Sequence, residues 1–204
     1  MGGALCCANT SGGVSKVKFS ATSVVGAWLL DIEPIEDERG FFARSLCADE
    51  LNTFGLEMQI KQQNISRNLK CGMIRGLHYQ IYPYEEIKLV RVTKGRIYDV
   101  IVDLRVDSSS YLQWYSVELT SENHRTIYIP KGVAHGFQTL EDNTEVFYQM
   151  SCEYASDYSC GVLWNDPTFS ITWPIENPIL STRDKNFKNY SETNNYVVSD
   201  NNIS

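Results

Sequence analysis

The sequence predicts an all-β fold, a sandwich or barrel of short strands with a few short helices. Through the middle of the chain, short segments rich in β-branched and aromatic residues alternate with Gly, Asn, Asp and Ser turn residues. Only Ala48–Phe54 has a helical pattern, and it is expected at one edge of the fold. The 204 residues are 43% apolar and 12% aromatic, which suits one compact domain.

The strands are predicted from composition and from the turns that separate them. The clearest is Arg96–Leu104, where β-branched and aromatic residues dominate between the turn Lys94-Gly95 and the polar stretch Asp107–Ser110. The expected strands in chain order are Ala27–Ile32, Phe41–Ser45, Met58–Ser66, Met73–Tyr79, Lys88–Thr93, Arg96–Leu104, Trp114–Leu119, Thr126–Ile129, Phe137–Leu140 and Glu145–Met150. A fold of this kind has an open end where inward side chains can line a pocket.

Both ends of the chain differ from this middle part. Residues 1–22 begin with small, polar, aperiodic sequence and are expected to form an N-terminal tail. Residues 188–204 are rich in Asn and Ser and are expected to form a C-terminal tail. The folded domain is therefore expected over residues 23–187.

The overall charge limits the partners that the protein can have. The formal net charge is −7, so the surface lacks the basic footprint of a nucleic-acid-binding protein, and any bound phosphate needs a local arginine or lysine cluster. No apolar run approaches the ~18 residues of a membrane span, and the N-terminus has neither a secretory nor a myristoylation pattern. We therefore expect a cytoplasmic protein with no nucleic-acid or membrane partner.

The sequence shows no pattern typical of a metal or redox site. It has no Cys-x-x-Cys pair, no His-x-His pair and no Gly-x-Gly-x-x-Gly fingerprint. We therefore expect neither a metal nor a cofactor. Reduced thiols are expected at all six cysteines, which are Cys6, Cys7, Cys47, Cys71, Cys152 and Cys160.

Two histidines lie in or beside expected strands, whereas His124 lies in a polar turn. His78 follows Arg75-Gly76-Leu77, and His135 follows the turn that begins at Pro130. Because side chains alternate faces along a strand, a regular strand would separate Arg75 from His78, and a β-bulge at Gly76 would bring them together. Taken alone, each strand histidine fits a structural role as well as a catalytic one.

Two further polar residues fall in segments that otherwise favour burial. Lys88 precedes the apolar pair Leu89-Val90 and is either an exposed strand charge or a cation in a pocket. Tyr148, in the segment Glu145–Met150, is either core packing with a wet hydroxyl or a proton donor.

Seven ordered motifs are more specific than any one of these residues. They are Asp37-Glu-Arg-Gly-Phe-Phe, Gln62-x-Asn-x-Ser, Arg75-Gly-Leu-His-Tyr-Gln, Lys88-Leu-Val-Arg, Ile129-Pro-x-Gly-x-Ala-His-Gly-Phe, Trp164-Asn-Asp-Pro and Leu180-Ser-x-Arg-Asp. From about residue 25 to residue 187, the chain resembles the dTDP-4-dehydrorhamnose 3,5-epimerase family. The resemblance implies a double-sheet jelly roll of the cupin type, a homodimer, and a cofactor-independent epimerase of a nucleoside-diphosphate 4-keto-6-deoxyhexose.

The resemblance also implies roles for single residues. His78 is similar to the catalytic base of the family, Asp184 to the carboxylate that orients it, and Tyr148 to the acid on the opposite face. Lys88 is similar to the cation near the sugar carbonyl. The residues implied in holding the nucleotide and sugar are Arg39, Gln62, Asn64, Arg75 and His135, with Tyr154 as a stacking aromatic. Arg44 and Arg183 are also expected to bind the substrate, although both depart from the family pattern.

The chemistry explains why these residue types are needed. A ketone at carbon 4 activates the C–H bonds at both carbon 3 and carbon 5. A histidine, with an ordinary pKa of ~6.5, can take such a proton near neutrality when a carboxylate fixes its tautomer. A lysine beside the enolate oxygen stabilises the developing charge, and inversion needs a donor on the other face.

Three positions depart from the dTDP branch of the family. Arg44 stands where that branch usually has a glutamate, Ser159 where it often has an acidic residue, and Arg183 where it often has a lysine. Thymine carries a donor at N3 and suits a carboxylate, whereas cytosine carries an acceptor there and suits an arginine. We therefore hypothesise that the carrier is CDP or another nucleotide if Arg44 faces the base.

Alternatives from other classes stay open at this point. The chain could be a single-site C3 epimerase of a CDP-linked 4-keto sugar, or a cupin domain that binds a sugar nucleotide without catalysis. A keto-sugar isomerase on the same scaffold would need no opposite-face acid at Tyr148. The presence of His78, Lys88, Tyr148 and Asp184 together favours an epimerase.

Overall fold

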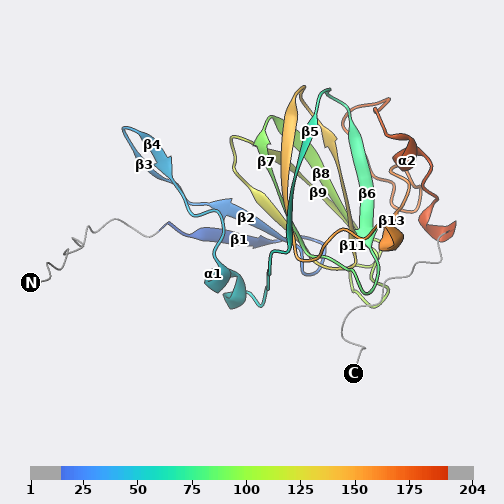
Figure 1. Ribbon diagram of the computed structural model, residues 1–204, viewed down its shortest axis with the longest axis horizontal. Helices are drawn as coiled ribbons and strands as arrows, with labels where there is room; N and C mark the ends of the chain where they lie inside the picture. The colour runs from blue at the N-terminus through green and yellow to red at the C-terminus, as the bar shows by residue number, and fades with distance from the viewer. Residues whose placement is uncertain (1–14, 193–204) are drawn as a thin grey trace, which may run out of the picture.

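The computed structural model describes residues 15–192, which form two facing antiparallel β-sheets with short helices at their margins (Figure 1). The larger sheet has six strands in the order β1-β2-β10-β7-β12-β5, and the smaller has five in the order β13-β6-β11-β8-β9. Strands β3 and β4 form a separate hairpin. This arrangement confirms the predicted all-β, double-sheet fold with a few short helices.

The elements are short, as the sequence predicted. The six-stranded sheet contains β1 (Val17–Ala21), β2 (Trp28–Ile32), β5 (Gln62–Asn68), β7 (Lys88–Lys94), β10 (Thr126–Ile129) and β12 (Thr144–Met150). The five-stranded sheet contains β6 (Ile74–Gln80), β8 (Arg96–Asp103), β9 (Trp114–Thr120), β11 (Val133–Thr139) and β13 (Ser159–Gly161). The remaining elements are β3 (Ile35–Asp37), β4 (Gly40–Phe42), α1 (Ala48–Thr53), η1 (Ser156–Tyr158), α2 (Thr182–Lys185) and η2 (Tyr190–Glu192).

Strand β8 is buried on both faces, which explains its nearly continuous apolar sequence. Ile97 and Ile101 belong to the main core, where they join Val90 and Val92 of β7 between the sheets. Val100 and Val102 join a second cluster. That second cluster includes Val162, Phe169 and Tyr190, so the C-terminal segment covers the outer face of the five-stranded sheet.

The expected tails, residues 1–22 and 188–204, each include residues that belong to the folded domain. Val17–Ala21, assigned to an N-terminal tail, form β1 and pair with all of β2 from Val17↔Ile32 to Ala21↔Trp28. At the other end, Tyr190 is only 4% exposed, and its backbone N–H donates to Asp166. Polar composition hid both segments, because an edge strand and a single anchoring aromatic carry little apolar sequence.

Several strand boundaries also differ from the predictions. β11 begins at Val133, before the expected Phe137, because Gly132 (φ 76) closes a short turn after Pro130. β5 begins at Gln62 and not at Met58, and β4 ends at Phe42. The short elements β1, β3, β13 and α2 were not predicted.

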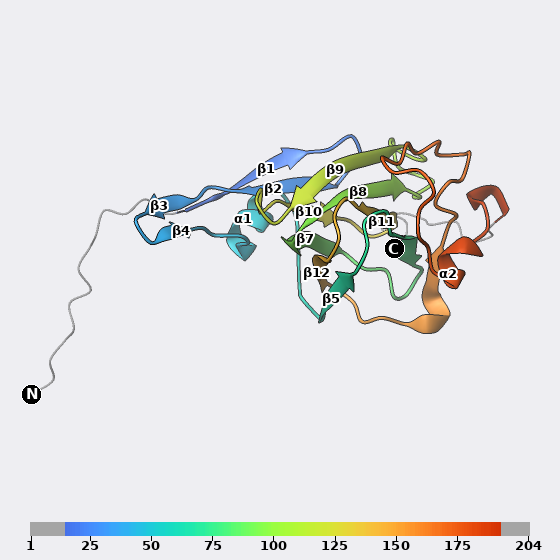
Figure 2. The ribbon, with the colours of Figure 1, turned by 90° about the horizontal axis from the view of Figure 1, so that it is seen from above.

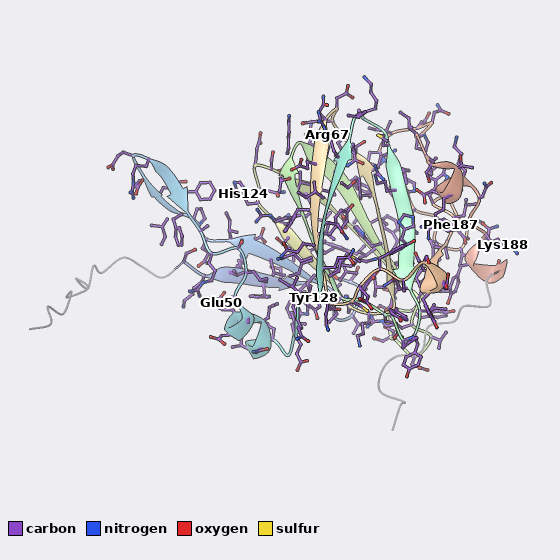
Figure 3. All side chains as sticks on the ribbon, viewed as in Figure 1. Glu50, Arg67, His124, Tyr128, Phe187 and Lys188 are labelled. Carbon is purple, nitrogen blue, oxygen red and sulfur yellow. The ribbon has the colours of Figure 1, made fainter. Side chains whose placement is uncertain are left out.

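The β3–β4 hairpin projects from the end of the sandwich opposite β6 and α2 (Figures 1 and 2). Its Phe42 side chain is 72% exposed, whereas the Phe41 ring lies 5.0 Å from the ring of His124, which Figure 3 labels. Helix α1 packs its Leu51 into a third apolar cluster with Leu30 and Tyr128. The hairpin therefore has little support from its own chain.

Residues 15–192 lack two features that would indicate other protein classes. No helix there is long and apolar enough to cross a membrane, and no three His, Cys, Asp or Glu side chains gather as a metal-binding group would require. Among these described residues, Cys47, Cys71, Cys152 and Cys160 form no disulfide bond. Cys6 and Cys7 lie outside the described residues.

A buried carboxylate organises the turn after β8. Asp103 is completely buried and accepts hydrogen bonds from the Arg105 guanidinium and from the hydroxyls of Ser108 and Ser110. Burial opposes its ionisation, but these bonds outweigh burial and hold the pKa of Asp103 below its ordinary value. We expect Asp103→Asn to lower the free energy of unfolding at pH 7 by about 3 kcal/mol, as measured by urea denaturation.

The pH dependence of this loss follows from the sign of the shift. A carboxylate with a lowered folded-state pKa stabilises the fold above its unfolded pKa of ~3.9, and this stabilisation disappears as pH falls through the folded-state value. The gap between wild type and variant should therefore narrow in acid. Asp142→Asn is the matched control, since Asp142 pairs with Lys70 at the exposed surface and should matter far less. Equal losses at both aspartates would contradict the assignment.

Candidate active site

A half-buried histidine on β6 and a buried aspartate on α2 form a close pair. The Nε2 atom of His78 lies 2.7 Å from Oδ1 of Asp184. Ser181 caps α2, because its hydroxyl accepts from the Asp184 backbone N–H at 3.0 Å and fixes the start of the helix. An ionised carboxylate can only accept, so Nε2 carries the hydrogen and Nδ1 of His78 keeps the free lone pair.

A β-bulge in β6 brings Arg75 and His78 to the same site, as the sequence analysis anticipated. In the ladder with β11, His78 pairs with His135 and Arg75 pairs with Phe137, so β6 has one extra residue between these pairs. Gly76 occupies the bulge at φ 119, and a Cβ there would lie 2.6 Å from Cα of Gly136. Only glycine fits this close crossing of two strands.

The environment keeps the pair poised for proton transfer. Burial is the largest influence on His78 and lowers its pKa, while the hydrogen bond and charge of Asp184 oppose the shift. For Asp184, burial opposes ionisation, but hydrogen bonds from His78, Ser181 and the Gly76 backbone outweigh it and lower the pKa. Near neutral pH the imidazole is therefore neutral and the carboxylate is ionised.

The pair opens onto a cavity of about 350 Å³. Its lining residues are Met73, Ile74, Arg75, His78, Ile179, Leu180, Ser181, Arg183 and Asp184. Arg75 and Arg183 supply two guanidinium groups beside the imidazole, although the chain as a whole is acidic. This is the kind of local cationic cluster that a phosphate group needs.

Lys88 is buried immediately behind the base. Its side chain is 8% exposed, its Nζ donates to the His78 carbonyl oxygen at 3.3 Å, and it pairs with Oε1 of Glu86 at 2.9 Å. The other oxygen of Glu86 accepts from the amide of Gln80. Of the two sequence interpretations, the exposed strand charge is wrong. Lys88 lines a separate small space without room for water, and it does not line the larger cavity.

Tyr148 belongs to the opposite sheet, and its ring contacts that of His135. His135 lies directly across the ladder from His78, and its ring centroid is 6.3 Å from that of Tyr148 on β12. Nε2 of His135 lies 2.7 Å from the fully buried carboxylate of Asp99. Burial, reinforced by the charge of Asp99, raises the pKa of Tyr148 well above its ordinary value. Tyr148 therefore keeps its proton at any physiological pH.

Four predicted substrate-binding residues form a connected chain of hydrogen bonds beside the pair. The guanidinium of Arg183 donates to the Tyr154 hydroxyl at 3.3 Å, and the Tyr154 backbone N–H donates to Oε1 of Gln62 at 3.0 Å. Gln62 in turn donates to Asn64 at 3.1 Å. This series of hydrogen bonds runs from Arg183 of α2 to Asn64 of β5. In the sheet, Asn64 pairs with Tyr148 of β12.

The structure does not bring Arg39 and Arg44 to this cavity. Arg39 lies at the turn of the β3–β4 hairpin, is 84% exposed, and pairs only with Asp37 among the described residues. Arg44 follows the hairpin and pairs with Glu50 of α1 at 2.8 Å, a residue that Figure 3 labels far from Phe187 and α2. Within one chain, both arginines therefore lie far from the cavity that contains His78.

Several residues that hold the site in place were not predicted from the sequence. Asp99 and Glu86 are buried carboxylates beside His135 and Lys88, and an acidic residue within an otherwise apolar strand was the available signal for Asp99. Ser181, three residues before Asp184, matches the helix-capping pattern that would have located α2.

Comparison with known proteins identifies the relatives of this chain. A family model described as dTDP-4-dehydrorhamnose 3,5-epimerase matches residues 21–192. The protein of that name from Methanothermobacter thermautotrophicus is 38% identical over 187 residues, which cover 90% of this chain and 100% of that protein. These matches confirm the resemblance drawn from the sequence motifs.

Solved structures agree. The dTDP-4-dehydrorhamnose 3,5-epimerase of Bacillus anthracis, with TDP and PPi bound, superposes with a TM-score of 0.81 at 43% identity, covering 84% of this chain and 98% of that chain. ChmJ, a 3'-monoepimerase from Streptomyces bikiniensis in complex with dTDP-quinovose, gives 0.77 at 28% identity, covering 83% and 86%. The fold is thus the cupin-like double-sheet jelly roll that the resemblance implied.

Proposed function

The chain belongs to the dTDP-4-dehydrorhamnose 3,5-epimerase family, and from this premise we propose how its own residues invert a sugar carbon. The substrate is a nucleoside-diphosphate 4-keto-6-deoxyhexose, and the reaction is epimerisation at carbon 3, carbon 5 or both. Nδ1 of His78 removes the proton next to the ketone, and the electron pair of that C–H bond moves to the carbonyl oxygen as an enolate. The Tyr148 hydroxyl then protonates the same carbon from the opposite face.

The observation that carries this proposal is the His78–Asp184 pair at an arginine-lined cavity. The 2.7 Å contact fixes the tautomer of the base and stabilises the imidazolium that forms. Arg75 and Arg183 of the same cavity suit the diphosphate. Tyr148 comes from the facing sheet and so can act on the other side of a sugar bound between them. Lys88 supplies a buried cation behind the base, where its Nζ donates to the His78 carbonyl oxygen.

The pH dependence of epimerase activity should follow the protonation of His78. Because burial lowers the pKa of His78, the neutral base persists below pH 6.5 and activity falls only as pH drops through the lowered value. Tyr148 contributes no loss up to about pH 10, since its pKa is raised.

The hairpin supports a homodimer in which each subunit completes the site of the other. Arg39 and Phe42 project into solvent at the end opposite the cavity, so a substrate contact by Arg39 requires a second copy of the chain. Coexpression of Arg39→Ala with His78→Ala provides the test, because mixed dimers then hold one site with both residues intact. Activity above that of either variant alone supports the dimer, and no gain in isolated mixed dimers refutes it.

We also propose that Arg44 reads the base of the nucleotide. An arginine offers only donors, which suits the N3 acceptor of cytosine better than the N3–H of thymine. Isothermal titration with CDP, dTDP, UDP and GDP measures the preference directly. A clear preference for dTDP would reject a CDP carrier. The dTDP-linked ligand bound to ChmJ makes dTDP the specific alternative.

The experiment that tests the reaction as a whole is proton NMR in heavy water. The substrates are the CDP- and dTDP-linked 4-keto-6-deoxyglucose, and the signals followed are those of carbons 3 and 5. Exchange with inversion at both carbons identifies a 3,5-epimerase, and exchange with inversion at carbon 3 alone identifies a single-site enzyme. Binding without any exchange identifies a sugar-nucleotide-binding domain and overturns the proposal. The cytoplasmic location remains a prediction.

A further inference from the structure

Phe187 contacts the base from outside the cavity. Phe187 follows α2 and is labelled in Figure 3. Its ring centroid lies 5.7 Å from that of the His78 imidazole, in a T-shaped arrangement. The Arg183 guanidinium lies 5.6 Å from the centroid of the same ring. Phe187 does not line the cavity. One aromatic ring thus touches the base and a cationic residue of the cavity without facing the substrate.

A glycine creates the space that this ring fills. Gly161 of β13 lies directly opposite His78 in the ladder with β6. A Cβ at Gly161 would lie 2.3 Å from the tip of the Phe187 ring. Gly161 is not among the glycines with positive φ, so its backbone conformation is open to other residues. The ring, and not the backbone, excludes a side chain at this position.

We propose that Phe187 is a positioning residue for the catalytic base, because its ring occupies the niche over Gly161 and presses the His78 imidazole toward Asp184 while excluding water. The inference rests on the proposed role of His78. It assigns Phe187 no contact with the sugar. Its effect reaches the reaction only through the orientation and hydration of the imidazole.

The electrostatics give this role a measurable sign. The charged and titratable groups around His78 are Asp184 and Arg183 from α2, Lys88 from β7, His135 from β11 and Arg75 from β6 itself. Burial has the largest influence and lowers the pKa of His78. Loss of the ring leaves the charges in place and admits water. The pKa of His78 should therefore rise toward that of a solvated histidine paired with a carboxylate.

The test compares Phe187→Ala, Phe187→Leu and Gly161→Ala in the full-length protein. Two readouts are the NMR titration of the His78 imidazole, assigned by its loss in His78→Gln, and the acid limb of kcat/KM. Phe187→Ala should raise both midpoints by about half a pH unit or more, and Phe187→Leu should restore most of the low value. Gly161→Ala should shift them by displacing the ring, yet add nothing in the Phe187→Ala background.

Phe19→Ala is the matched control, since it removes a half-buried phenylalanine that stacks on Phe54 far from His78. The control should lower stability without moving the His78 titration. A titration unchanged by Phe187→Ala, or moved equally by Phe19→Ala, overturns the positioning role. The imidazole titration does not require turnover, so failure of the epimerase proposal would appear separately, as absence of deuterium exchange in the wild type.

Discussion

His78→Ala should stop deuterium exchange at carbons 3 and 5 of the keto sugar, with a loss of roughly 10²–10⁴-fold in rate. This change removes the imidazole that is paired with a carboxylate at the arginine-lined cavity. Asp184 cannot substitute, because its lowered pKa makes it a weak base. Nucleotide binding should persist, since Arg75 and Arg183 remain. The measurement is proton NMR in heavy water beside titration calorimetry with the nucleoside diphosphate.

His78→Asn separates loss of the base from loss of structure. The asparagine amide can still donate a hydrogen bond to Asp184, so the buried carboxylate keeps a partner and the fold is preserved. Exchange should be lost in both variants, and added imidazole should restore part of it in His78→Ala. Exchange at a near-normal rate in His78→Asn would remove His78 from the reaction.

The fold could be predicted because the local composition of most strands indicates a strand. In β8, β-branched residues face two cores at once, so its sequence is unmistakably that of a buried strand. The elements that were missed, such as β13 and α2, have three and four residues and too little sequence to show a period. β13 forms because it pairs with β6, and α2 begins where Ser181 caps it.

The candidate site was only partly predictable, for a different reason. Motif order identified His78 and Asp184, which meet although they lie 106 positions apart. It could not show that Lys88 is buried against Glu86, because the pairing depends on how β7 faces β6 across the sandwich. Nor could motif order show that the β3–β4 hairpin, which carries Arg39, lies at the end of the molecule opposite α2. Sequence motifs indicate which residue types a site needs, but not where the fold places each of them.

Tyr148→Phe should separate exchange from inversion. His78 can still remove a proton and return a solvent deuteron to the same face, so exchange continues, whereas the opposite-face donor is missing and inversion should fall by roughly 10²-fold or more. The raised pKa of Tyr148 supports this role, since the hydroxyl stays protonated and able to donate until the enolate forms. Proton NMR of the sugar ring distinguishes the two stereoisomers and their deuterium content.

Tyr128→Phe is the matched control for loss of a buried hydroxyl. Tyr128 lies on β10 of the same sheet, its pKa is raised to about 12 by burial and by Glu57, and its hydroxyl donates to the Glu57 carbonyl in the α1 cluster. That variant should lose some stability and keep both exchange and inversion. If Tyr148→Phe inverts the sugar as fast as Tyr128→Phe, the second proton comes from another group. His135, whose ring adjoins Tyr148 and is held by Asp99, then becomes the donor that the geometry favours.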